Sequence, residues 1–150
     1  MQSVRTRRAA GAPHPRSPRA AVEADFGPGE LIDVRRLVTD VAEDAGLSRR
    51  RADELAVIVN ELAANSVDHA GGRGTVRAWA ERDAVVVEVT GDGALARPPG
   101  GRSRGEALPR RDAERGRGLW IARQLADDLT IRPADATSGA GTVVRVVQAR

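Results

Sequence analysis

Apolar side chains recur at helical spacing in three stretches of the chain. Residues 30–45 follow the i, i+3, i+4, i+7 rule of an amphipathic helix, and a glycine ends the pattern. A second and longer helix is predicted over residues 49–70. The third is predicted to run from Leu119 to Asp127 or Asp128.

Alternation of apolar and polar side chains predicts strands in the rest of the chain. It is present in five stretches: residues 21–26, 74–81, 84–90, 129–132 and 141–148. The second and third of these form a hairpin, and a long loop follows them. The order of elements predicts an α+β fold, a two-layer α/β sandwich. Its mixed, mostly antiparallel sheet is covered on one face by three helices.

Composition narrows the class of protein. A chain of 150 residues that is 41% hydrophobic suits one domain with one core. It has no cysteine, which excludes disulfides and thiolate metal sites, and its two histidines are too few for a histidine-rich zinc site. No apolar run approaches the roughly 18 residues of a membrane span. The N-terminus lacks the apolar segment of a signal peptide, so we expect a cytoplasmic protein that does not contact membranes.

The positive charge is concentrated at the N-terminus. Residues 1–20 carry five arginines and no acid, and their lack of periodicity predicts a disordered tail ahead of a folded domain at 21–150. The remainder holds 24 − 5 = 19 basic against 21 acidic groups. A broad nucleic-acid surface is therefore not expected. All Lys and Arg positions are arginines. Because no lysine is present, only arginine side chains or backbone N–H groups can contact a phosphate.

Two polar residues stand out inside the second predicted helix. Glu61 and Asn65 are four residues apart, so both project from one helix face, among largely apolar neighbours. Burying a polar group without a partner costs roughly 1–3 kcal/mol. A metal–phosphate group would explain them, because an amide oxygen can ligate Mg²⁺ and a carboxylate one turn away can accept a proton. A solvated edge of an amphipathic helix is the alternative.

Glycine-rich breaks flank a long polar loop. Gly91-Asp92-Gly93 follows a valine-rich strand, and residues 91–115 have little apolar content. A loop of this length in a small domain is usually functional or disordered. Gly116-Arg117-Gly118 then opens the third helix, where free N–H groups and the helix dipole attract an anion. With Glu61 and Asn65, these features indicate a nucleotide site.

At these residues the chain resembles a known family. It is similar to the ATP-binding domains of bacterial anti-sigma-factor serine/threonine kinases, which share the Bergerat fold of the GHKL superfamily with histidine kinases and gyrase. The stretch E-L-A-A-N-S-V-D-H-A at residues 61–70 resembles their N-box, and G-R-G-L-W at 116–120 resembles their glycine box. G-T-V-V-R-V at 141–146 resembles their closing strand. The resemblance covers about residues 20–148 and implies ATP and Mg²⁺ as cofactors.

The resemblance implies a role for each matching residue. Asn65 stands where the Mg²⁺-ligating asparagine lies, and Glu61 where the general base takes the proton of the attacking hydroxyl. Thr142 stands where a strand residue supports the adenine pocket. Residues 94–115 correspond to the ATP lid. Phosphate contacts, chiefly through backbone N–H groups, fall to Arg115, Gly116, Arg117, Gly118 and Leu119.

The adenine motif departs from the family pattern. That pattern, D-x-G-x-G, places its aspartate at Gly91 when aligned on Gly93, and Asp92 lies one residue late. A one-residue shift turns a side chain to the opposite face of a strand, although the flanking glycines let the loop bend and bring Asp92 to the adenine. Without this contact, adenine binding weakens by about 1–3 kcal/mol. A GHKL-fold binding module that has lost kinase activity is therefore the alternative to a kinase.

The resemblance leads to an expected function. We expect an ATP-binding regulator of transcription that binds a sigma factor, phosphorylates a serine or threonine of a STAS-type anti-sigma antagonist, or does both. A histidine kinase is disfavoured, because the chain has no helix pair with a phospho-acceptor histidine. Nucleic-acid binding through the N-terminal arm is a third alternative, and it predicts a steep salt dependence.

Three side chains outside the motifs carry separate predictions. His69 follows Asp68 at a helix end and is expected to cap or pack. Trp120 is expected to pack under the sheet. Trp79 shares a strand face with Arg77, away from the helices. We expect Trp79 to lie open there and to contact a partner or a second copy in a homodimer.

Overall fold

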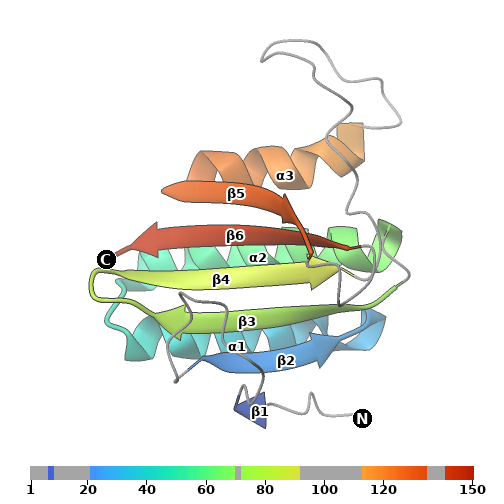
Figure 1. The fold of residues 1–150 in the computed structure, drawn as a ribbon. Helices are drawn as coiled ribbons and strands as arrows, with labels where there is room; N and C mark the ends of the chain where they lie inside the picture. Colours follow the sequence, from blue (N-terminus) through green and yellow to red (C-terminus); the bar gives the residue numbers. More distant parts are fainter. Residues whose placement is uncertain (1–6, 9–20, 70–71, 92–112, 135–140) are drawn as a thin grey trace.

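The chain folds into one sheet with helices on one side (Figure 1). The computed structural model describes residues 7–8, 21–69, 72–91, 113–134 and 141–150. The α+β class and the two-layer arrangement predicted from the sequence are confirmed.

Six strands form the sheet, in the order β1-β2-β3-β4-β6-β5. All five neighbouring pairs are antiparallel, so no parallel pair is present in the described part of the expected mixed sheet. The last strand turns back from β5 and inserts between β5 and β4, antiparallel to both. The bounds are β1 Arg7–Arg8, β2 Val22–Phe26, β3 Gly74–Ala80, β4 Ala84–Gly91, β5 Asp128–Pro133 and β6 Thr142–Ala149.

Three helices cover one face of this sheet. They are α1 Leu31–Asp44, α2 Arg49–His69 and α3 Ala113–Leu125, and a short 3-10 turn, η1 Pro28–Glu30, precedes α1. The middle helix, α2, packs against both α1 and α3. No helix in the described ranges is long and apolar enough to cross a membrane.

The core lies between the helices and the sheet. Alternate residues of each strand face the helices, and on β4 these are Val85, Val87 and Val89, all fully buried. The longest contribution from a helix comes from α2. Its buried apolar residues are Ala52, Leu55, Ala56, Ile58, Val59, Leu62 and Ala63. This burial holds α2 in place along most of its length, and it also sets the position of the polar residues on the other sides of the helix.

Two predicted boundaries are corrected by the structure. The third helix begins at Ala113, ahead of the glycine box that was expected to open it. It ends at Leu125, because the Asp127 N–H donates to the Val147 carbonyl at 3.2 Å and the chain enters β5. Within the predicted disordered tail, Arg7 and Arg8 form the strand β1, which pairs with β2. The rest of residues 1–20 lies outside the described part.

Trp79 lies on the predicted face of the sheet but is not exposed there. Its side chain is only 1% exposed and packs with Ala21, Val86 and Val147. The guanidinium carbons of Arg77 and Arg145 lie 5.9 and 5.7 Å from its ring centroid, and its Nε1–H donates to Glu81 Oε1 at 3.2 Å. The expected open contact surface at Trp79 is therefore wrong. Cation–π contacts and a partner for the indole N–H allow this ring to be buried on a polar face.

Trp120 also differs from its prediction. The sequence predicts that it packs under the sheet, yet it is 62% exposed. Two residues further along α3, Ala122 is fully buried. Residues two apart point about 200° away from each other around a helix, so a buried Ala122 turns Trp120 outward.

Candidate functional site

The predicted site residues that the structure describes lie towards one end of the sandwich. Thr142 at the start of β6 pairs with Gly91 at the end of β4 and with Pro133 at the end of β5. The C-terminal half of α2, with Glu61 and Asn65, runs towards this same end (Figure 1). Residues up to 81 positions apart in the chain thus lie at the same end of the domain, because of the sheet register and the packing of α2.

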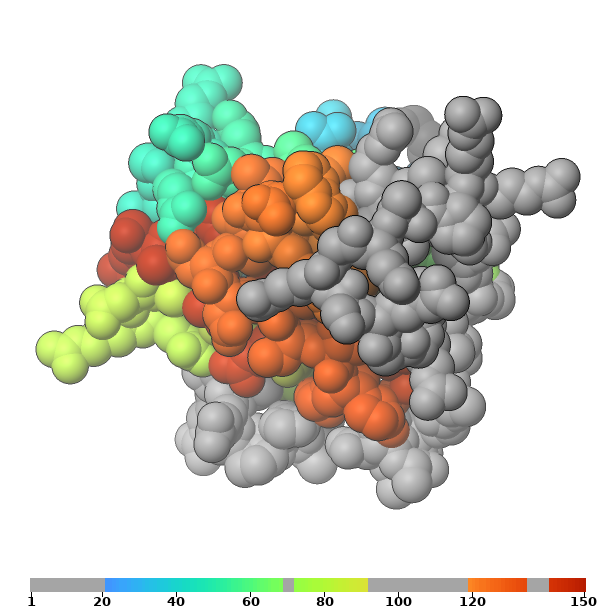
Figure 2. All heavy atoms as spheres, turned by 90° about the horizontal axis from the view of Figure 1, so that it is seen from above, coloured from blue at the N-terminus to red at the C-terminus, as the bar shows by residue number. Residues whose placement is uncertain are grey.

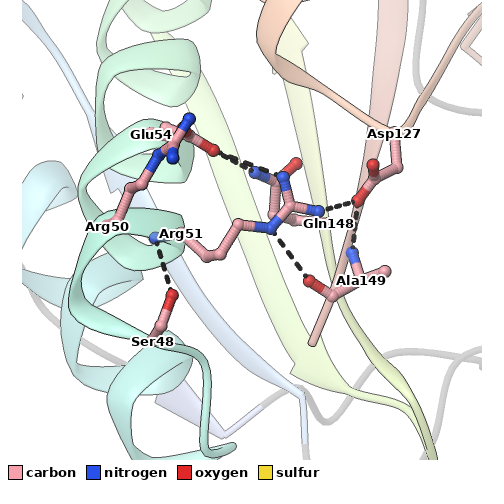
Figure 3. A network of polar contacts seen from close by, with 7 residues as sticks. All are labelled: Ser48, Arg50, Arg51, Glu54, Asp127, Gln148 and Ala149. Atoms are coloured by element: carbon pink, nitrogen blue, oxygen red, sulfur yellow. Dashed lines mark hydrogen bonds and ion pairs between the residues drawn. The ribbon is translucent and has the colours of Figure 1, made fainter.

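The opposite end is closed by a polar cluster, the clasp, made by Arg51, Glu54, Asp127 and Gln148 (Figure 3). The Arg51 guanidinium donates to Glu54 Oε2 at 3.3 Å, to the Ala149 carbonyl at 3.3 Å and to Asp127 Oδ2. Asp127 Oδ2 also accepts the Ala149 N–H at 2.7 Å. The clasp therefore ties the start of α2 to the end of α3 and the end of β6.

The clasp fixes how α2 and α3 run past each other. Because Arg51 near the start of α2 meets Asp127 just after α3, the two packed helices are antiparallel. Glu61 lies ten residues after Arg51, and Arg117 lies ten residues before Asp127. At 1.5 Å per residue both are about 15 Å from the clasp along the helix axes. The glycine box thus lies level with Glu61, as a nucleotide site made from both requires.

Glu61 and Asn65 lie on the side of α2 that faces α3. Glu61 is seven residues after Glu54, and Asn65 is fourteen after Arg51, so they share a helix side with the clasp. Both are half-buried, and neither side chain hydrogen-bonds to a residue in the described ranges. The next polar residue towards the sheet, Ser66, is fully buried and donates to the Leu62 carbonyl at 3.1 Å. Within the described part of the chain, the side-chain oxygen atoms of Glu61 and Asn65 are therefore free to bind a ligand.

At the sheet end of the site, the backbone at Gly141, just before β6, lies very close to the backbone at Gly91, the last residue of β4. A Cβ atom added to Gly141 would lie 2.6 Å from the Gly91 carbonyl oxygen. The Ala134 N–H donates to the Gly141 carbonyl at 2.8 Å, which brings in the end of β5. By strand alternation, position 91 faces the helices as Val87 and Val89 do. A glycine there projects no side chain from β4 towards α2.

The glycine box lies inside α3, whereas the sequence predicts that it precedes the helix. Because the helix begins at Ala113, its free N–H groups are those of the first turn, Ala113 to Arg115. The N–H groups of Arg117, Gly118 and Leu119 fall inside the helix, and the Leu119 side chain packs on the core. Binding phosphate through these later N–H groups requires the first turns of α3 to open. Asp92, Gly93 and residues 94–112 of the predicted lid lie outside the described residues.

The side-chain oxygen atoms of Glu61 and Asn65 suit a cation whose other ligands come mainly from a bound phosphate. No group of three histidine, cysteine or acidic side chains that could hold a metal ion is present in the described ranges. Mg²⁺ normally takes only one or two protein ligands and completes its shell with substrate phosphates and water. The Asn65 amide oxygen and the Glu61 carboxylate, one helical turn apart and without hydrogen-bond partners among the described residues, fit that requirement.

The match to a protein family agrees with this geometry. A family model described as the histidine kinase-like ATPase domain matches residues 26–148. The chain belongs to this family. The match spans every element from the end of β2 to β6, including α2 with Glu61 and Asn65. A search of curated proteins finds no match. Membership supports nucleotide binding by a domain with the fold described above.

Sequence reasoning missed the clasp. Its members are up to 97 residues apart, and only Gln148 gives a local signal, as a polar residue inside a valine-rich strand. The structure shows it to be fully buried, with Nε2 donating to Glu54 Oε2 at 3.3 Å and Oε1 without a partner among the described residues. A buried acceptor of this kind lowers stability.

Replacing Gln148 with leucine should therefore keep or raise stability. The variant removes the unpaired oxygen, and Glu54 retains Arg50 and Arg51 as partners. We expect the free energy of unfolding to stay level or to rise by about 1 kcal/mol, as measured by urea denaturation. A loss of more than about 2 kcal/mol would show that the Gln148–Glu54 hydrogen bond outweighs the cost of the buried oxygen.

Proposed function

We propose that this protein is a Mg²⁺·ATP-dependent regulator that transfers the γ-phosphoryl group to a serine or threonine of a STAS-type anti-sigma antagonist, and that it also binds a sigma factor. The observation that carries the proposal is the position of Glu61 relative to the glycine box. The two lie at the same distance from the clasp along the axes of the antiparallel helices α2 and α3. The free N–H groups at the start of α3 then lie within about one helical turn of the Glu61 level along the axis. The family match supports the nucleotide, and the resemblance of the motifs supports the class of acceptor.

Each residue has a role that its position allows. The carboxylate of Glu61 accepts the proton of the acceptor hydroxyl, since it is half-buried and has no partner in the described part. The Asn65 amide oxygen, one turn further along α2, holds the cation. Mg²⁺, when bound, neutralises charge on the phosphates during transfer. The start of α3 directs N–H groups and its dipole at the same phosphates.

A binding module without kinase activity is the second candidate, and Gly91 favours it. The position faces the helices but has no carboxylate that could accept a hydrogen bond from an adenine amino group. In this case the fold would bind a protein partner, and no phosphoryl group would be transferred.

Calorimetric titration with Mg²⁺·ATP separates the two candidates, and transfer of labelled phosphate to a purified STAS-domain antagonist tests the reaction. Binding followed by transfer supports the kinase. Binding of the antagonist without either nucleotide binding or transfer supports the module. A parallel titration with Mg²⁺·GTP compares the affinities for the two nucleotides. It measures how strongly the protein prefers adenine over guanine when position 91 has no side chain.

Substituting Asn65 with alanine should weaken Mg²⁺·ATP binding about tenfold, because one oxygen ligand of the cation is lost. The effect should vanish when both proteins are titrated with ATP and EDTA, since no cation is then held. Asp68→Ala, on an exposed residue of the same helix, is the matched control. An equal loss with and without Mg²⁺ would show that Asn65 contacts the nucleotide directly.

A further inference from the structure

One face of the sheet, the outer face, is turned away from the helices, and no described element lies over it. The three helices pack on the opposite face (Figure 1). Figure 2, seen from above, shows the first half of α2 (turquoise) on one side of β6 (red) and β4 (yellow-green). Yet Trp79 and Val86, which are paired across β3 and β4 on the outer face, are only 1% and 0% exposed. Such burial is not expected on an uncovered face of a sheet.

Polar atoms of the outer face are also shielded from solvent. Glu88, two residues along β4 from Val86, is 7% exposed. The guanidinium of Arg77 lies over the Trp79 ring, and its Nε atom is buried without a hydrogen-bond partner among the described residues. Side chains of one sheet face cannot cover one another completely, so the burial of Arg77 above Trp79 requires a further layer. That layer has to come from residues outside the described ranges.

Residues 9–20 begin and end at the same corner of the outer face. Arg8, the last residue of β1, is paired with Val22 at the start of β2, and Ala21 packs on Trp79. A loop between two neighbouring antiparallel strands usually takes about two to five residues, whereas residues 9–20 number twelve. The surplus length therefore starts and returns beside Trp79.

The length of residues 9–20 suits the width of the outer face. In a polyproline II conformation a residue advances about 3.1 Å, so six residues out and six back reach about 19 Å. Neighbouring strands are about 4.8 Å apart. From β2 the segment can therefore cross β3 and β4 to β6, the strands that carry Trp79, Val86 and Val147.

The internal segments 92–112 and 135–140 start at the opposite end of the sheet. Gly91 is five residues from Val86 along β4, which is about 17 Å, and residues 92–112 then lead to α3 in the helix layer. Residues 135–140 end at Gly141, beside Gly91, and three residues each way reach only about 10 Å. Residues 9–20 are therefore better placed to cover the Trp79 end.

The composition of residues 9–20 suits this surface. Their sequence, A-A-G-A-P-H-P-R-S-P-R-A, has three prolines, two arginines and no acid. Proline favours the extended polyproline II conformation, and segments with the P-x-x-P spacing, here from Pro15 to Pro18, dock on aromatic side chains. The outer face supplies the Trp79 ring within an apolar cluster, and the carboxylates of Glu81 and Glu88.

Charge is complementary at one position that the sheet register fixes. β2 pairs with β3 so that Val22 is opposite Ala78. Continuing this antiparallel register past Ala21 places Arg19 opposite Glu81. Glu81 also accepts the Trp79 Nε1–H, so an arginine at position 19 would join the segment to the Trp79 cluster.

We propose that the outer face around Trp79 is the docking surface for the chain's own proline-rich segment, residues 9–20. The segment lies in a polyproline II conformation across β3, β4 and β6, with Arg19 opposite Glu81. This inference does not depend on the proposed function, because it concerns the face of the sheet opposite the helices. It assigns the surface to basic P-x-x-P-R sequences, and the N-terminal segment occupies it within the same chain.

The fluorescence of Trp79 tests the proposal in the full chain. A Trp120→Phe background leaves Trp79 as the only tryptophan, and because Trp120 is 62% exposed its exchange should not disturb the core. In this background the buried Trp79 ring should emit at short wavelength and be quenched weakly by acrylamide.

Removing the prolines should expose Trp79. In the triple variant Pro13→Gly/Pro15→Gly/Pro18→Gly we expect the Trp79 emission to shift to longer wavelength and its quenching by acrylamide to rise, because glycine does not favour the polyproline II conformation. The double variant Pro98→Gly/Pro99→Gly, which removes prolines from another segment, is the matched control and should leave both unchanged.

Tryptic cleavage after Arg16 gives a second readout. Because only the undocked fraction is cut, we expect cleavage of the full chain to be about tenfold slower than that of a synthetic peptide of residues 9–20. The triple variant should lose this protection relative to a peptide with the same substitutions. Arg19→Glu, which sets two carboxylates opposite each other, should weaken the protection too, and Arg123→Glu, at an exposed position of α3, should not.

Cleavage of the full chain at the rate of the free peptide would overturn the docking, as would unchanged Trp79 emission and quenching in the triple variant. An equal change in the Pro98 and Pro99 control would overturn it as well. Protection that grows with protein concentration would overturn docking within one chain and assign the surface to the segment of a second copy. Urea denaturation of each variant shows whether the sheet is folded, so that exposure of Trp79 is not mistaken for unfolding.

Discussion

Replacing Glu61 with glutamine should lower the rate of phosphoryl transfer roughly 10²–10⁴-fold, the range that a positioned general base contributes. Glutamine keeps the shape of the side chain but cannot accept a proton. The half-buried Glu61 is uncommitted in the described part of the chain, so the exchange breaks no structural hydrogen bond there. Stability and Mg²⁺·ATP affinity should therefore stay close to those of the wild-type protein.

Single-turnover transfer of labelled phosphate measures this effect apart from substrate binding. Asp53→Asn is the matched control, because it removes one negative charge from an exposed position on the same helix, eight residues before Glu61. A wild-type rate in the Glu61 variant would rule out its role as the base. A comparable loss in the Asp53 variant would point to a general effect of charge on the surface of α2.

Replacing Gly141 with alanine should damage both stability and nucleotide binding. The added Cβ would meet the Gly91 carbonyl oxygen at 2.6 Å, and that atom belongs to the backbone of β4. A flexible side chain could move aside, but here the ends of β4 and β6 have to separate. We expect the free energy of unfolding to fall by about 1–3 kcal/mol and Mg²⁺·ATP affinity to fall with it.

Gly29→Ala serves as the control for the Gly141 variant. A Cβ at Gly29 has nothing within 4 Å, so this exchange should leave stability level or raise it slightly by restricting the unfolded chain. Urea denaturation and calorimetric titration should be run on both variants. Wild-type behaviour of Gly141→Ala in both measurements would mean that the two strand ends are not held as closely as the structure shows.

Much of the fold was predictable because it depends on local periodicity. The helical spacing around Leu55 and Leu62 and the alternation along Val85–Val89 place apolar side chains on one side of each element, and burying them leaves few arrangements. The same logic put Glu61 and Asn65 on one side of α2. It could not place the start of α3, because the glycines that favour a helix start at Gly116 are also tolerated inside the first turns.

The two tryptophans show where periodicity stops being informative. Alternation correctly put Trp79 on the sheet face opposite the helices, but its burial depends on Arg77, Arg145 and Val147, which come from separate strands. Trp120 follows Leu119, and both are apolar, so spacing alone does not say which one faces the core. The full burial of Ala122 decides it.

The sequence by itself determined the class of fold, the pairing of Glu61 with Asn65 on one helix side, and the family to which the motifs belong. These follow from patterns within about ten residues, where helix and strand geometry leaves little choice. Only the tertiary structure decided that α2 and α3 run antiparallel, that the glycine box stands level with Glu61, and that Trp79 is buried while Trp120 is exposed. These depend on contacts such as Arg51 with Asp127, whose partners are 76 residues apart in the chain, and no local pattern encodes a distance of that kind.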